Sequence, residues 1–357
     1  MHKSRRQLLR WTGGGLGAAM FAPLRMAFAI SEPDRVLAVS CLGGNAGPVL
    51  TLVHAETLQV LATLPSPVAL VHPASRWAFG RDLVWGGIPG RVVGINAATG
   101  TIGFAADTRS NLNQTELTPD GRFVLCAAAG TDKVLKIDAD PDSPTAGRIV
   151  ETADHYPGAN PSDLTMLADG SYCFTADRGG DTVSVFQVDP LRKVATVPLE
   201  RGGTRALEPI MATVSPRGDY LFVETARGSG GELVLDISNP MRPFEVKRFE
   251  QVDGLGTNPA SNEFSPDGRF SLIVNRSSAD LTVVDADLLQ IRGRVALPDG
   301  SAPMTGTFAP EGTRFFVPLS GRDTVAVVNV PEFEVTQFIA VGPKPVGIAY
   351  LETAIPR

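Results

Sequence analysis

The chain of 357 residues has few of the residue types on which metal and disulfide sites depend. It holds four histidines and three cysteines, Cys41, Cys126 and Cys173. The cysteines are too few and too scattered for a disulfide framework, and no CxxCH is present to attach a c-type haem. Without clustered Cys or His, a zinc or copper centre has little support, so we predict no metal site. We interpret the cysteines as small buried hydrophobes, with a Cys126–Cys173 bridge as the minor alternative.

Several motifs of known chemistry are also missing. The sequence contains no GxSxG nucleophile elbow and no P-loop, so no catalytic residue can be assigned. After the N-terminal segment, no apolar run approaches the length needed to span a bilayer. Sequence motifs therefore favour a protein without a recognisable catalytic centre and without a membrane span.

The N-terminal segment predicts export. It contains the charged stretch "SRRQLLR" at 4–10, a weakly apolar run and the small residues "AFA" at 27–29. The Arg5–Arg6 pair followed by leucines resembles a twin-arginine signal, which exports folded proteins; the alternative is a generic secretory signal. We expect residues 1–29 to be removed, with cleavage near Ala29, and the protein to be periplasmic.

Removal of this segment makes the protein more acidic. The segment carries five basic residues and no acid, so the net charge of −6 becomes −11. Phosphate backbones would repel such a chain, which makes nucleic acid a poor partner.

One short pattern recurs along the chain. "TPDGRF" at 118–123 and "SPDGRF" at 265–270 have relatives at 167–172, 215–220 and 309–314, and a degenerate copy, "HPASRW", at 72–77. The glycines of the five clear copies, Gly121, Gly170, Gly218, Gly268 and Gly312, are 49, 48, 50 and 44 residues apart. A near-constant period of this size indicates a repeat architecture, and the Pro-Asp-Gly sequence is typical of a hairpin turn.

Strands surround each turn. A short strand precedes it, and an apolar run, a polar loop and an alternating strand follow it, as in "LTVVDAD" at 281–287. Alternating third strands occur seven times, at 49–58, 92–100, 133–140, 182–189, 232–239, 281–288 and 324–333. The last segment, "GPKPVGIAY" at 342–350, supplies the opening strand of a unit whose other strands lie at the N-terminus. We therefore predict one domain over residues 30–357, an all-β seven-bladed propeller of four-stranded antiparallel blades, closed by a blade that both chain ends share.

The repeat "NPASNEFSPDGRFSLIVNRSSADLTVVDADLLQIRGRVAL" at 258–297 resembles the YVTN-type propeller repeat of bacterial surface and periplasmic proteins. The resemblance extends over essentially all of the chain after residue 29. It implies the propeller fold but not one function, because the superfamily includes haem-d-one domains of nitrite reductases, amine dehydrogenase heavy chains and lactonases.

A candidate site lies in the loops between the second and third strands. These loops place Arg178, Arg227 and Arg276 at spacings of 49 and 49, with Arg322 and Arg81 near the corresponding place. A partial ring of guanidinium groups at one face would suit an anionic ligand such as a polycarboxylate. The alternative is that each arginine pairs locally with an acid of its own or the next blade.

The segment "DHYPGANPSD" at 154–163 adds a histidine and a tyrosine at the channel mouth. His155 could ligate a metal or haem iron or act as a base, although a single histidine is more often a loop residue. The predicted ligand-binding residues are Arg81, His155, Tyr156, Arg178, Arg227, Arg276 and Arg322.

Three functions follow from these features. The first is a monomeric binding protein or scaffold that holds a partner protein or a small anion at the loop face. The second, which the haem-d-one resemblance implies, is a redox or assembly protein that binds a tetrapyrrole; no cofactor is required by the sequence. The third is a lactonase, which we expect least because the Gly-Pro-Arg-His stretch of phosphogluconolactonase-like propellers is missing.

Overall fold

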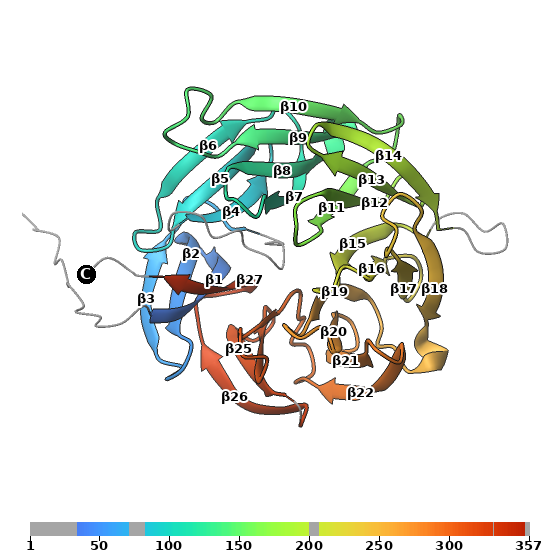
Figure 1. Ribbon diagram of the computed structural model, residues 1–357. Helices are drawn as coiled ribbons and strands as arrows, with labels where there is room; N and C mark the ends of the chain where they lie inside the picture. The colour runs from blue at the N-terminus through green and yellow to red at the C-terminus, as the bar shows by residue number, and fades with distance from the viewer. Residues whose placement is uncertain (1–33, 71–82, 200–206, 331, 354–357) are drawn as a thin grey trace, which may run out of the picture.

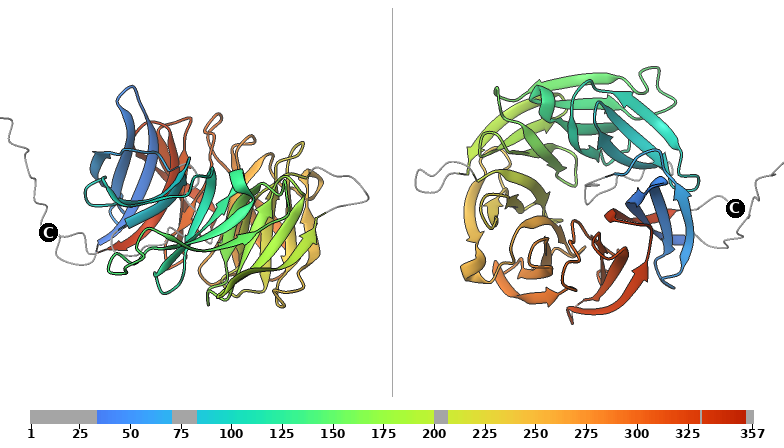
Figure 2. Two further views of the ribbon diagram at one scale, coloured as in Figure 1. Left: turned by 90° about the horizontal axis from the view of Figure 1, so that it is seen from above. Right: turned by 180° about the vertical axis from the view of Figure 1, so that it is seen from behind.

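The computed structural model describes residues 34–70, 83–199, 207–330 and 332–353, which form a ring of seven β-sheets around a central channel (Figure 1). Seen from above, the ring is a disc whose sheets stand side by side (Figure 2). We number the sheets as blades 1 to 7. The predicted all-β seven-bladed propeller is confirmed. No helix in this part of the chain is long and apolar enough to cross a membrane.

The blades are antiparallel, and in blades 2 to 6 the strands follow one another in sequence order from the channel to the rim. Blade 1 contains β4 (Leu83–Ile88), β5 (Arg91–Asn96) and β6 (Ile102–Asp107). Blade 2 contains β7 (Leu112–Leu117), β8 (Phe123–Ala128), β9 (Lys133–Asp138) and β10 (Ile149–Asp154). Blade 3 contains β11 (Pro161–Met166), β12 (Tyr172–Asp177), β13 (Thr182–Val188) and β14 (Leu191–Pro198).

Blade 4 contains β15 (Pro209–Val214), β16 (Tyr220–Thr225), β17 (Gly231–Asp236) and β18 (Phe244–Phe249). Blade 5 contains β19 (Pro259–Phe264), β20 (Phe270–Asn275), β21 (Asp280–Asp285) and β22 (Gln290–Ala296). Blade 6 contains β23 (Thr307–Phe308), β24 (Arg314–Leu319), β25 (Thr324–Asn329) and β26 (Glu334–Ala340). Two short 3₁₀ turns, η1 (Ala129–Thr131) and η2 (Gln251–Asp253), lie between strands.

Blade 7 closes the ring with strands from both chain ends, as the sequence predicted. It contains β27 (Pro345–Thr353) at the channel, followed by β1 (Asp34–Gly44), β2 (Gly47–His54) and β3 (Val60–Pro65). Strand β27 pairs with β1 along nearly its whole length, from Val36 opposite Leu351 to Cys41 opposite Pro345. One side of β27 is thereby paired within a sheet, so blade 7 has an inner strand like the other four-stranded blades.

The recurring hexapeptide forms the turn between the first and second strands. In blade 2 the hydroxyl group of Thr118 accepts a hydrogen bond from the Phe123 N–H (3.0 Å), and Asp120 accepts one from the Arg122 N–H (3.0 Å). Ser265 and Asp267 make the same bonds in blade 5. The turn glycine has a φ of about +70° in every clear copy, the left-handed region that glycine adopts without strain. The degenerate copy at 72–77 lies outside the described residues.

The core is divided among the blade interfaces. Seven clusters of buried hydrophobic residues each lie between two neighbouring blades. Cys126 belongs to the cluster between blades 1 and 2 and Cys173 to that between blades 2 and 3; both are buried and free. The interpretation of the cysteines as core residues is therefore confirmed, and the alternative of a Cys126–Cys173 bridge is wrong because the two thiols lie in different interfaces.

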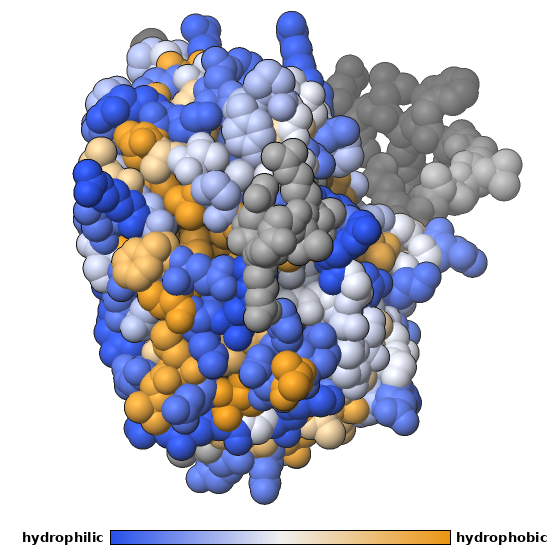
Figure 3. All heavy atoms as spheres, turned by 90° about the vertical axis from the view of Figure 1, so that its right-hand side faces the viewer, coloured by the Kyte–Doolittle hydropathy of each residue, from blue (hydrophilic) through white to orange (hydrophobic). Residues whose placement is uncertain are grey.

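The outer surface is mixed in character. Strand β18 at the rim of blade 4 exposes Phe244 and Val246, and charged residues alternate with them along the strand. Figure 3 shows hydrophobic groups on this side of the ring separated by hydrophilic ones. Charged side chains of this kind discourage a rim strand from pairing with another molecule.

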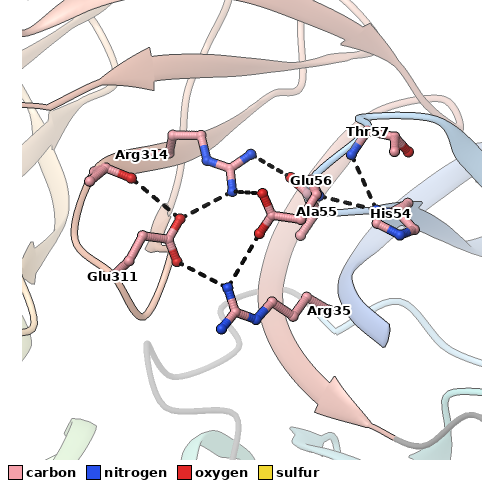
Figure 4. Close-up of polar contacts among 8 residues, drawn as sticks. Arg35, His54, Ala55, Glu56, Thr57, Glu311 and Arg314 are labelled. Carbon is pink, nitrogen blue, oxygen red and sulfur yellow. Dashed lines mark hydrogen bonds and ion pairs between the residues drawn. The ribbon is translucent and has the colours of Figure 1, made fainter. Parts of the chain in front are cut away.

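A network of four charges holds blade 6 to blade 7 beside the closure (Figure 4). Arg314 donates hydrogen bonds to the Ala55 carbonyl oxygen (2.7 Å), to Glu56 (2.8 Å) and to Glu311 (3.1 Å). Arg35 lies 3.4 Å from Glu56 and 3.8 Å from Glu311. Each carboxylate therefore faces two guanidinium groups, and Arg314 is the member with the most bonds.

We predict that Arg314→Ala lowers the free energy of unfolding by about 1–3 kcal/mol, because it removes three hydrogen bonds from charged or carbonyl acceptors at the closure. Urea unfolding followed by tryptophan fluorescence measures the change. Arg91→Ala is the control, since Asp107 is the partner of Arg91 among the described residues and both side chains are more than half exposed; its effect should be below about 1 kcal/mol. Equal effects of the two substitutions would contradict a special role for the closure network.

Candidate functional site

The loops at one end of the channel are held by a repeated arrangement of hydrogen bonds. Asp132, between β8 and β9, accepts hydrogen bonds from the N–H groups of Gly158 and Asn160, both at 2.7 Å. Asp181, between β12 and β13, does the same for the segment before β15, at 2.8 and 2.9 Å. Each carboxylate thus ties the segment that leads into an inner strand to the preceding blade.

A second set of bonds fixes the loop residues themselves. Each leading segment has one residue in the left-handed conformation: Asn160 (φ 47°), Glu208 (φ 53°) and Asn258 (φ 57°). The carbonyl oxygens of these residues accept hydrogen bonds, respectively, from the N–H groups of Arg178 (3.2 Å), Ala226 (3.0 Å) and Arg276 (2.9 Å). The loop residue that donates this hydrogen bond is therefore held in the same place in blades 3, 4 and 5.

The residue in that place lies eight positions after the turn glycine. Counted in this way, Arg178 and Arg276 are at position eight, whereas Arg227 is at position nine and Ala226 takes the place of an arginine. The even spacing of the three arginines in the sequence conceals this offset, because blade 4 follows blade 3 after 48 residues and not 49. Two of the predicted arginines are thus equivalent, and the third is not.

A cavity of about 500 Å³ occupies the channel at these loops. Much of the cavity wall comes from two positions of the repeat. One is the loop residue eight positions after the turn glycine, and the other is the residue eight positions before the turn glycine, at the inner strand of the blade. The lining residues are Ala69, Gly87, Ile88, Pro89, Leu112, Ser162, Arg178, Ile210, Met211, Ala226, Asn258, Ala260, Arg276 and Met304. The wall is mostly apolar, and both of its charged side chains are arginines.

Arg178 and Arg227 share one acid. Arg178 donates a hydrogen bond to Glu208 (2.9 Å), and Arg227 lies 3.6 Å from the other oxygen of the same carboxylate. The Arg178 guanidinium, followed by that of Arg227, holds the pKa of Glu208 below its usual range. For Arg178, the alternative of pairing with an acid of the next blade is therefore the one that the structure shows.

Arg276 differs from the other two. Its backbone N–H bonds to Asn258, but its exposed guanidinium makes no ion pair or hydrogen bond with any residue that the structure describes. Arg178 and Arg276 are the charged residues among the described residues that line the cavity, and of these two Arg178 is the one paired with an acid there. The unpaired guanidinium of Arg276 makes the cavity a candidate for an anionic ligand.

The remaining predicted residues lie elsewhere. Arg322, at position ten, is exposed and donates to the Asp299 carbonyl oxygen (2.6 Å) outside the cavity lining. The hydroxyl group of Tyr156 lies 2.7 Å from that of Thr182, and burial raises the pKa of Tyr156. Arg81 lies outside the described residues.

His155 is buried inside blade 3 and does not line the cavity. Its ring lies 4.7 Å from that of Phe186, and its Nε2 lies 2.9 Å from the Thr175 hydroxyl group. That hydroxyl group donates to Asp177 (2.7 Å), so it accepts a hydrogen bond from the Nε2–H group of His155. Asp177 also accepts from Thr182 and Ser184. The surroundings of His155 are those of a residue that connects strands.

Buried acids near the cavity were missed as a group by the sequence analysis. Glu224 and Glu232 are fully buried on neighbouring strands of blade 4, and Asp163 is buried in β11. Burial raises the pKa of Asp163 to about 7 and raises the pKa values of Glu224 and Glu232, which also repel each other. One signal was available: in "YLFVET" at 220–225, Glu224 interrupts an apolar strand at a position where the repeat normally places a hydrophobic residue.

Comparison with known proteins identifies the same fold. The model of the family described as "Lactonase, 7-bladed beta-propeller" matches residues 95–288, more than half of the chain. Among curated proteins, the hydrazine synthase subunit beta of Kuenenia stuttgartiensis is 24% identical over an alignment of 202 residues, and the match covers 47% of this chain and 52% of that protein. The chain thus spans about half the length of this relative.

Solved structures with the same fold include enzymes of two kinds. A periplasmic gluconolactonase from Pseudomonas aeruginosa has a TM-score of 0.68 at 20% identity and covers 90% of this chain and 99% of its own. A putative 6-phosphogluconolactonase from Bacteroides uniformis has a TM-score of 0.68 at 18% identity and covers 90% and 100%. Hydrazine synthase from Kuenenia stuttgartiensis has a TM-score of 0.61 at 15% identity and covers 77% and 93%. At these identities the likeness shows the fold alone.

We predict that His155→Ala lowers the free energy of unfolding by about 2–4 kcal/mol, because it leaves a cavity and removes a partner of the buried Thr175 and Asp177. Urea unfolding measures the change. The control is His54→Ala, since the Nδ1 atom of His54 accepts hydrogen bonds at a turn, from the N–H groups of Glu56 and Thr57 (3.1 and 3.2 Å). We expect the control to lose about 1 kcal/mol. If His155→Ala lowered the free energy of unfolding no more than His54→Ala does, the buried position of His155 would be wrong.

Proposed function

Since the chain belongs to the lactonase seven-bladed β-propeller family, we propose that it is a periplasmic propeller that binds a small anionic ligand in the channel cavity. The observation that carries the proposal is Arg276, a residue of the cavity wall whose guanidinium has no acid paired to it among the described residues. The periplasmic location rests on the export signal expected at residues 1–29.

The ligand that suits the cavity combines an apolar body with a carboxylate or similar anion. Ile88, Leu112, Ile210, Met211 and Met304 form an apolar wall. Arg276 presents a planar fork of donors to that space, and such a fork binds a carboxylate with two parallel hydrogen bonds. Arg178 adds a second guanidinium, although its bond to Glu208 competes with the ligand.

The arrangement favours binding without chemistry. None of the described lining residues is an acid, a histidine, a lysine or a cysteine, so the wall contains no general base or strong nucleophile. The histidines of the described chain also offer no axial ligand for a haem at the cavity, because His155 is buried in blade 3 and His54 lies at the rim of blade 7. A tetrapyrrole-binding role is therefore not favoured by any observation.

Hydrolysis of a lactone is the second candidate. The family match supports it, and Glu208 beside Arg178 is an acid at the edge of the cavity that could act as a base if the ligand displaced it from the arginine. A panel of sugar and aliphatic lactones tests this candidate, with the release of acid followed in a pH-stat. Turnover that Glu208→Gln abolishes would establish hydrolysis, and equal rates with and without protein would exclude it for those lactones.

We predict that the protein binds naphthalene-2-carboxylate, which has the expected apolar body and anionic group, and does not bind the neutral naphthalene-2-methanol. Arg276→Ala should weaken binding of the carboxylate about 10–100-fold, since a hydrogen bond to a charged group contributes about 1.5–3 kcal/mol. Isothermal titration calorimetry measures both affinities. The matched control is Arg322→Ala, in the same type of loop but outside the cavity lining, which should leave the affinity unchanged. Binding unaffected by Arg276→Ala would contradict the proposed site.

A further inference from the structure

A row of three side chains crosses blade 4 from the cavity outward. In the strand register, Met211 of β15 is opposite Glu224 of β16, and Glu224 is opposite Glu232 of β17. Cross-strand partners project from the same face of a sheet, and neighbouring strands are about 4.8 Å apart. Because Met211 lines the cavity, Glu224 lies one strand behind the cavity wall and Glu232 lies two strands behind it.

Glu224 and Glu232, which we call the acid pair, have too few hydrogen-bond donors for two ionised carboxylates. Both side chains are fully buried. Asn262 of blade 5 donates one hydrogen bond to Glu232 Oε1 (3.0 Å) and is the amide nearest to the acid pair, while both oxygens of Glu224 and Oε2 of Glu232 lie within hydrogen-bond distance of no donor among the described residues. Like charges directly opposite each other in a sheet repel, and a buried carboxylate without partners is strongly disfavoured. The acid pair is therefore stable only while it holds protons.

The surroundings provide little compensating charge. On blade 5, Asp280 and Arg294 form an ion pair with each other and so balance each other's charge. From blade 3, Asp163 adds a further negative charge when it ionises. On blade 4 itself, Lys247 lies over the ring of Phe249, 5.2 Å from its centroid. These groups leave the acid pair as a site where ionisation adds uncompensated negative charge behind the cavity.

We propose that anion binding in the channel cavity is coupled to protonation of the acid pair. The inference rests on the proposed function, since it concerns the regulation of the same site. When the acid pair is protonated, the arginines Arg178 and Arg276 set the potential in the cavity. When it ionises, negative charge one to two strands behind Met211 opposes the bound anion. By linkage, the bound anion favours the protonated pair to the same extent.

The consequence for stability has a definite sign. Burial and mutual repulsion raise the pKa values of both glutamates above those of the unfolded chain. Stability from the protonated pair is therefore fully present below the unfolded value of about 4.3 and is lost as the pH rises through the folded values. This dependence exists without any ligand, so it can be measured separately from binding.

We expect the melting temperature of the ligand-free protein to fall by about 5 °C or more between pH 6 and pH 9. The Glu224→Gln/Glu232→Gln variant should lose most of this dependence, because amides of the same shape do not titrate. The single variant Glu224→Gln leaves one carboxyl and should show an intermediate dependence. The control is Glu334→Gln, which removes an exposed acid from β26 and should behave as the parent protein. Equal pH dependence in the parent protein and the double variant would overturn the proposal.

Binding is measured with naphthalene-2-sulfonate, which stays ionised throughout this range. Its affinity for the parent protein should fall on the order of tenfold from pH 6 to pH 9, and its affinity for the double variant should fall much less, by the share that ionisation of Asp163 contributes. An affinity that Arg276→Ala removes but that is equal at the two pH values would overturn the coupling and leave the proposed function intact. No binding at either pH would overturn both.

One further experiment distinguishes protonation of the acid pair from binding of a metal ion. If the unpartnered oxygens bound a cation in place of a proton, calcium chloride at pH 8 would raise the melting temperature of the parent protein and not that of the double variant. That result would also overturn the proposal. A melting temperature unaffected by calcium is the expected outcome.

Discussion

The structure depends on the pairing of β27 with β1, the contact that turns a row of blades into a ring. Each blade buries hydrophobic residues against two neighbours, and the seven buried clusters lie at the seven interfaces. Without the closure, blade 7 would lack its inner strand and two interfaces would be open to water. The channel cavity depends on the same contact, because its wall takes residues from blades 1 to 6 and from the segment before blade 1.

Within the ring, the repeated loop arrangement determines which side chains reach the cavity. A backbone hydrogen bond from position eight to a left-handed residue fixes this position in blades 3, 4 and 5. The scaffold is therefore common to these blades, and the chemistry of the cavity is set by which residue occupies the position. Arg178 and Arg276 supply charge, whereas Ala226 leaves an apolar surface between them.

The sequence was sufficient for the fold because the fold consists of local signals repeated at a fixed period. Turn glycines such as Gly121 and Gly268 marked the hairpins, and the surplus third strand indicated a shared closing blade. The candidate site was predictable only in part. Arg178 and Arg276 were found by their spacing, but Arg227 was placed with them because the arginines were compared with one another and not with the turn glycine of each blade, which lies eight, nine and eight residues before them.

The positions of the buried polar side chains could not be predicted from the sequence, for a different reason. The loop composition around His155 suggested the channel mouth, yet its side chain turns into blade 3 to meet Thr175. Whether a polar residue faces the channel or a blade interface depends on the direction of a single side chain, which period and composition do not determine. The same holds for Glu224 and Glu232, whose pairing follows from the register of β16 and β17.

Blade 4 shows how such a position can matter. A hydrophobic residue in place of Glu224 would extend the cluster that contains Phe222 and Val234 and would add to the stability of the interface with blade 5. The acid pair instead places two ionisable groups where the repeat needs none, directly behind the apolar wall of the cavity. A ring with seven hydrophobic interfaces tolerates this loss at one of them. The acid pair and Met211 share one face of one sheet. A change of charge in the pair therefore alters the electrostatic potential in the cavity across one or two strands, and this effect requires no movement of the backbone.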